Sequence, residues 1–175
     1  ALKSGEYDPD RTALMITQTG GGCRASNYIH LLRKCMAEHY PQVPVISLNF
    51  AGLEKSKGFS LTAGMCVKLV YGVLYADLLM TLYNQCLPYE LNKGETDQVK
   101  QHWQEKLPTL FHGVKYLSAE KIYQEMLTDF ASIPRSQKKK IKVGIIGEIY
   151  VKYSPLANNH LEEFLIQEGC EPVVP

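Results

Sequence analysis

A glycine-rich turn that leads into a cysteine and an arginine is the segment of this sequence best suited to chemistry. Gly20, Gly21 and Gly22 are followed directly by Cys23 and Arg24. Glycines let the backbone approach a ligand closely, and the N–H groups at the start of a helix attract a negative group. The spacing matches neither the phosphate-binding loop nor the dinucleotide fingerprint. Two interpretations stay open, an anion or metal site or a tight connecting turn.

Cys23 is the residue of this turn with the most specific chemistry. A thiol in the first helical turn beside Arg24 favours the thiolate, which makes it a candidate metal ligand or nucleophile. The alternative is a small apolar side chain that fills space under the turn. A nucleophile needs a base, and His30 lies two helical turns or about 10 Å further along. We therefore weigh a cysteine-dependent enzyme below a metal ligand.

The other cysteines do not complete a metal site in the sequence. An iron–sulfur cluster takes about four thiolates or their substitutes, and no pair of cysteines is separated by two residues. We expect the other four to be core residues and any co-ligands of Cys23 to come from outside this sequence. These four are Cys35, Cys66, Cys86 and Cys170.

A second polar group follows the clearest apolar run of the sequence. Glu148, Lys152 and Asn159 cluster around the end of the predicted strand over residues 142–150. Side chains at the end of a parallel strand, next to the start of a helix, are well placed to bind a polar ligand. A helix-capping role explains Asn159 equally well, so both interpretations stay open.

Alternating strands and helices must position these residues. Apolar runs at residues 12–17, 43–48 and 142–150 predict buried parallel strands, and a fourth strand starts at residue 171. Apolar residues at helical spacing predict a helix over residues 23–39. The predicted fold is α/β, a doubly wound, Rossmann-like parallel sheet of about four strands, in one or two sheets, with flanking helices.

Three further helices are predicted between the two βαβ units. The first covers residues 60–86 and has Ser60 as its N-cap. The second covers residues 95–106 and ends before Pro108, and the third covers residues 119–132.

The chain divides by composition into three parts. Residues 1–134 form a βαβ unit plus a helical segment, residues 135–141 form a polar, basic linker, and residues 142–175 form a second βαβ unit that is truncated at its C-terminus. A phosphate-binding patch is the alternative interpretation of the linker. Both ends of the sequence resemble interrupted elements, so we expect a piece of a larger protein.

Composition excludes several classes of protein. Of 175 residues, 45% are hydrophobic and 21% are charged, which is typical of a globular domain. The formal net charge of +1 supplies no field that would attract nucleic acid or a membrane surface. Lys68 and Asp77 interrupt the apolar stretch at residues 61–87, which we interpret as a buried helix. Five cysteines in a chain of this size predict reduced thiols in the cytoplasm.

Four segments together resemble one family. Residues 2–5, 18–28, 43–49 and 147–153 are similar to the large C-terminal region of CoA-substrate-specific enzyme activases. These are the activators related to (R)-2-hydroxyglutaryl-CoA dehydratase. The resemblance covers nearly the whole chain and is weakest at about residues 94–137. The eleven-residue segment 18–28 is its most specific part.

The resemblance implies anaerobic, low-potential electron transfer. Activators of this type have an ATPase module of the acetate kinase and actin class with an iron–sulfur cluster, and they donate one electron to a 2-hydroxyacyl-CoA dehydratase. The matched region is similar to the dehydratase-subunit-like part, in which cysteines on βα loops hold a cubane 4Fe–4S cluster. Cys23 would be one ligand, with a partner cysteine just upstream of Ala1. Gly20 to Gly22 would supply backbone donors near the sulfurs.

The resemblance also implies partners. They are the rest of the same polypeptide, with its ATPase module and other α/β domains, and an acyl-CoA dehydratase. We expect a cluster in the full-length protein and neither a cluster nor turnover in this piece alone. The alternative is a non-catalytic module that docks on a dehydratase or binds CoA phosphates at the glycine turn.

Overall fold

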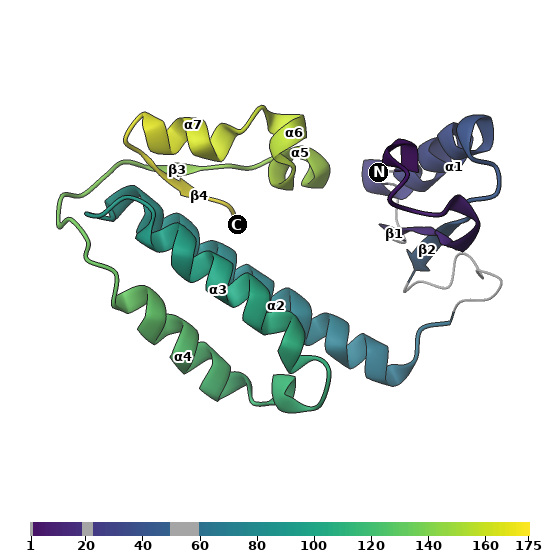
Figure 1. Ribbon diagram of the computed structural model, residues 1–175. Coiled ribbons are helices and arrows are strands. Elements are labelled where there is room, and N and C mark those ends of the chain that lie inside the picture. The colour runs from purple at the N-terminus through teal and green to yellow at the C-terminus, as the bar shows by residue number, and fades with distance from the viewer. Residues whose placement is uncertain (1, 19–22, 50–59) are drawn as a thin grey trace. The chain divides into compact units, whose positions relative to one another are not determined.

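The computed structural model describes residues 2–18, 23–49 and 60–175 (Figure 1). The chain separates into two compact units, Ala1–Leu61 (unit 1) and Thr62–Pro175 (unit 2). The predicted linker at residues 135–141 lies within unit 2.

Unit 1 contains a βαβ arrangement. Strands β1 (Leu14–Gln18) and β2 (Val45–Asn49) pair in parallel, with Leu14 opposite Val45. The 3₁₀ helix η3 (Arg24–Asn27) leads into helix α1 (Tyr28–His39) between them. These elements confirm the predicted pair of parallel strands and the helix that joins them. Two short 3₁₀ helices precede them, η1 (Leu2–Ser4) and η2 (Pro9–Arg11).

The core of unit 1 lies between α1 and the two strands. Ile29 of α1 is 1% exposed and Val43 before β2 is 3% exposed. Ala25 and Leu48 are also buried. Met15 on β1 is exposed, so one face of this short sheet is not covered by the described residues.

Three helices dominate unit 2. Helices α2 (Ala63–Cys86), α3 (Glu95–Leu110) and α4 (Ala119–Ala131) pack against one another (Figure 1). The 3₁₀ helices η4 (Leu87–Tyr89) and η5 (Lys115–Leu117) lie in the connections. The core contains Tyr75, Leu79, Cys86, Trp103, Tyr116, Ile122, Met126, Phe130 and Ile133.

The spacing of apolar residues explains how α4 enters this core. Ile122, Met126 and Phe130 recur every four residues and are all buried, because residues at this spacing share one helix face. Trp103 of α3 is fully buried, and its Nε1 donates to Asp129 Oδ2 at 2.9 Å. The buried indole therefore keeps a partner for its polar N–H.

A second two-stranded sheet completes unit 2. Strands β3 (Lys142–Gly144) and β4 (Glu171–Val173) pair in parallel. Between them lie the short helices α5 (Ile149–Tyr153), α6 (Pro155–Asn158) and α7 (Leu161–Gln167). Both α2 and α7 contact β4.

The predicted doubly wound sheet is wrong. The four strands form two separate sheets of two strands each, and helices make up 61% of the described residues. The physical reason lies in α2, α3 and α4, which bury their apolar faces against one another around Trp103. Helices with a core of their own do not form layers that flank a four-stranded sheet.

Three element boundaries also differ from the prediction. Thr62, not Ser60, caps α2, and its hydroxyl accepts from Met65 N at 3.2 Å. Pro108 lies inside the last turn of α3, and the helix continues past it to Leu110. The strand predicted over residues 142–150 ends at Gly144.

Helix α2 is not buried along its length, contrary to the prediction. With η4 it forms the one helix of the described residues that is apolar and long enough to span a bilayer by length and composition. Only 11% of its most apolar window is buried, and its mean hydropathy there is 1.6. Val70 and Val73 are 58% and 67% exposed, whereas Tyr75 and Leu79 enter the core.

Candidate functional site

The predicted glycine turn and its cysteine are described only in part. Gly20, Gly21 and Gly22 lie outside the described residues, so their predicted role as ligand donors stays a prediction. Cys23 is described and has an exposed, unpaired thiol. Its backbone is extended at the N-terminus of η3, and its carbonyl accepts from Ser26 N at 3.1 Å. The thiol makes no capping hydrogen bond, and Cys23 is exposed to solvent.

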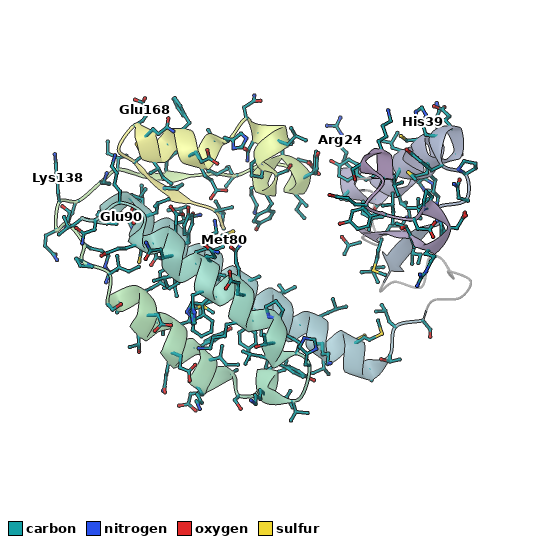
Figure 2. The ribbon with its side chains drawn as sticks, in the orientation of Figure 1. Arg24, His39, Met80, Glu90, Lys138 and Glu168 are labelled. Carbon is teal, nitrogen blue, oxygen red and sulfur yellow. The ribbon has the colours of Figure 1, made fainter. Side chains whose placement is uncertain are left out.

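Arg24 follows Cys23 on η3 and is exposed (Figure 2). Helix η3 contacts β1, which places both residues next to the sheet of unit 1. The chemistry available at this point is that of one accessible thiol beside one guanidinium group.

Gln18 positions η3, and sequence analysis did not identify this role. The Gln18 side chain at the end of β1 donates from Nε2 to the Ser26 carbonyl at 3.3 Å. Its Oε1 accepts from the Ser47 hydroxyl at 2.8 Å. One side chain thus connects β1, β2 and the helix that Cys23 precedes. A serine inside the apolar β2 segment, 6% exposed, was the available signal, because buried hydroxyls need partners.

The described residues do not form a complete metal site. No group of three or more His, Cys, Asp or Glu side chains in residues 2–18, 23–49 and 60–175 is arranged to hold a metal ion. Cys86 is buried, while Cys35 is exposed on a different segment, helix α1. The donor set therefore fits one ligand of a cluster and not a whole cluster, which takes about four.

Glu148 of the second predicted group has a local structural role. It is the N-cap of α5, and its Oε2 accepts from Val151 N at 3.2 Å. This contact satisfies a backbone donor at the start of a short helix.

Lys152 and Asn159 lie near the same short helices. Lys152 Nζ donates to the Pro175 carbonyl and lies 4.4 Å from the centre of the Tyr153 ring. Asn159 adopts the left-handed conformation at φ 55° after α6. Its neighbour Asn158, the last residue of α6, accepts at Oδ1 from the N–H of Leu161, the first residue of α7, at 3.2 Å. The predicted polar-ligand role of these residues stays a prediction.

Comparisons of this chain with protein-family models, with curated proteins and with solved structures found no match in any of the three.

Proposed function

We propose that this chain is part of an iron–sulfur protein of 2-hydroxyacyl-CoA dehydration, either an activator or a dehydratase-like protein. Its role is low-potential electron transfer within the full-length protein. Cys23 contributes one thiolate, and the other ligands come from outside the described residues. Cytoplasmic location and an acyl-CoA dehydratase as partner belong to the same proposal.

The accessible thiol of Cys23 is the observation that carries this proposal. It lies at the start of η3 within the segment 18–28, where the resemblance to the activase family is most specific. Gln18 connects that helix to both strands, which supports the element that Cys23 precedes. A ligand held by a rigid support binds a metal with less ordering cost than one on a free loop.

Iron and acid-labile sulfide content of the full-length protein, purified without oxygen, tests the proposal. We expect bound iron and sulfide in the wild type and a clear loss in Cys23→Ser. Cys35→Ser is the matched control, because Cys35 is also exposed in unit 1 but lies on α1. An iron-free wild type, or equal iron in Cys23→Ser and the wild type, would overturn the proposal.

A docking module that binds a dehydratase is the second candidate function, and the exposed face of α2 favours it. Val67, Val70, Val73 and Leu74 lie at helical spacing and are each more than 40% exposed. Contiguous apolar surface of this kind marks an interaction site. Under this candidate, Val70→Lys abolishes co-sedimentation with a purified acyl-CoA dehydratase, whereas Cys23→Ser leaves it unchanged. Binding that survives Val70→Lys excludes this face as the docking site.

A further inference from the structure

An open polar cavity of about 430 Å³ lies where several elements of unit 2 meet. The end of α2, the helix η4, the segment after α4 and the strands β3 and β4 all contribute to its lining. Glu90 directly follows η4, and Lys138 lies in the segment between α4 and β3. Both residues are labelled in Figure 2 and mark the end of unit 2 where these elements lie. Its lining residues include Gln85, Tyr89, Arg135, Ser136, Lys142 and Glu171.

The carboxylate in this cavity is already neutralised. Glu171 is 3% exposed, and its Oε1 lies 3.0 Å from Lys142 Nζ. Its Oε2 accepts from the Tyr89 hydroxyl at 2.7 Å. This hydrogen bond, together with burial, raises the pKa of Tyr89, so the phenol stays a donor at neutral pH. The cavity wall is thereby fixed, and the negative charge of Glu171 is compensated inside the wall.

Arg135 is left as the uncompensated charge. Its Nη1 donates to the Cys86 sulfur at 3.6 Å, and a thiol is a weak acceptor. No carboxylate among the described residues lies within 4.0 Å of its guanidinium group. Two cations and one carboxylate line the cavity, which leaves one net positive charge.

Neutral polar side chains share the cavity lining with Arg135, which is itself exposed to solvent. The Ser136 oxygen accepts from Lys138 N at 3.2 Å, so its own hydrogen is free to point elsewhere. Gln85 and Gln137 add amide groups to the lining. A guanidinium with several N–H donors binds the oxygens of a phosphoryl group in a bidentate manner.

We propose that this cavity is a binding site for a phosphoryl group, with Arg135 as its principal ligand. The ligand is either inorganic phosphate or the phosphates of a nucleotide, which share this chemistry. The site lies in unit 2 and requires neither Cys23 nor a metal.

Titration calorimetry on the full chain at constant ionic strength tests this site. The probes are inorganic phosphate, pyrophosphate and adenosine diphosphate, and each is added to wild-type protein in air. We expect the wild type to bind at least one probe. The affinity for that probe should be at least tenfold weaker in Arg135→Gln and intermediate in Arg135→Lys. Lys121→Gln is the matched control, since Lys121 is a 78% exposed cation of α4 away from the cavity lining, and its affinity should equal that of the wild type.

The same experiment separates the two sources of the ligand. If adenosine diphosphate binds tenfold tighter than pyrophosphate, the ligand is a nucleotide. If the two affinities are equal, the ligand is a free phosphate.

Three results would overturn the site. They are no binding of any probe, unchanged affinity in Arg135→Gln, or an equal loss in Lys121→Gln. Fluorescence of Trp103, the single tryptophan of the chain, reports whether each variant keeps its folded core. If Arg135→Gln does not keep its folded core, the affinity of Arg135→Lys becomes the test. An affinity of Arg135→Lys equal to that of the wild type would refute the bidentate role of Arg135. None of these measurements depends on iron, so failure here is distinct from failure of the cluster proposal.

Discussion

Gln18 is the residue through which the sheet of unit 1 holds the helix that Cys23 precedes. We expect Gln18→Ala to destabilise η3 and α1 by about 1–2 kcal/mol, because the Ser47 hydroxyl and the Ser26 carbonyl each lose a partner. Hydrogen exchange of peptides from residues 24–39 should accelerate in this variant. Gln42→Ala is the control, since Gln42 is exposed and should leave exchange unchanged. Equal exchange in Gln18→Ala and the wild type would contradict the role.

The proximity of Cys23 and Arg24 could be predicted from the sequence, but the hydrogen bonds of Gln18 that hold the neighbouring helix could not. Cys23 and Arg24 are adjacent in the chain, so their proximity needs no tertiary information. The contact between Gln18 and Ser47 joins residues 29 positions apart, and it exists only once β1 and β2 pair. The polar character of Gln18 alone gave no sign of which group it would bind.

At the scale of elements, the start of α2 depends on Thr62. We expect Thr62→Ala to lower the free energy of unfolding by about 1 kcal/mol, because the Met65 N–H loses its capping acceptor. Urea unfolding followed by circular dichroism at the helical band measures this change. Ser60→Ala serves as the comparison, and we expect it to have little effect. A larger loss of unfolding free energy in Ser60→Ala than in Thr62→Ala would show that Ser60 is the N-cap, as the sequence predicted.

The start of α3 depends on a carboxylate outside the helix. Glu90 accepts from Gly94 N at 2.9 Å and from Thr96 N at 3.0 Å. Burial raises the pKa of Glu90, but the hydrogen bonds from Gly94 and Thr96, together with the charge of Lys93, lower it more, and the pKa lies below its ordinary value of 4.5. The ionised form is therefore favoured in the folded state, and its contribution to stability is present above pH 4.5.

We expect Glu90→Gln to reduce the free energy of unfolding by about 1 kcal/mol at neutral pH. The difference from the wild type should shrink as the pH falls below 4.5 and through the folded pKa, because Glu90 is then protonated. Urea titrations at several pH values measure the difference. A gap between the two proteins that stays constant from pH 7 to pH 3 would show that the Glu90 charge is not involved.

Helix positions were predictable because periodicity reports burial on one face. The spacing of Ile122, Met126 and Phe130 is helical in the sequence and is buried in the structure. Short apolar runs are ambiguous, and residues 142–150 show this. Their first three residues pair with β4, while Ile149 and Tyr150 begin α5. Apolar character alone does not distinguish a strand from a short helix.

The prediction of a doubly wound parallel sheet was wrong about the surface on which the helices pack. Strand–helix alternation predicted helices that pack on a common sheet. The helices α2, α3 and α4 instead pack on one another, and each strand pair stays separate. Local pattern identifies which residues are buried, but the surface that buries them is a tertiary property.

We propose that Cys23 is a ligand of an iron–sulfur cluster in the full-length protein. Electron paramagnetic resonance of the anaerobically purified, chemically reduced protein tests it most directly, because the signal reports the ligands of the cluster. We expect a cluster signal that is the same in the wild type and Cys35→Ser, and that is lost or changed in shape in Cys23→Ser. A cluster signal in Cys23→Ser identical to that of the wild type would show that Cys23 is not a ligand of the cluster.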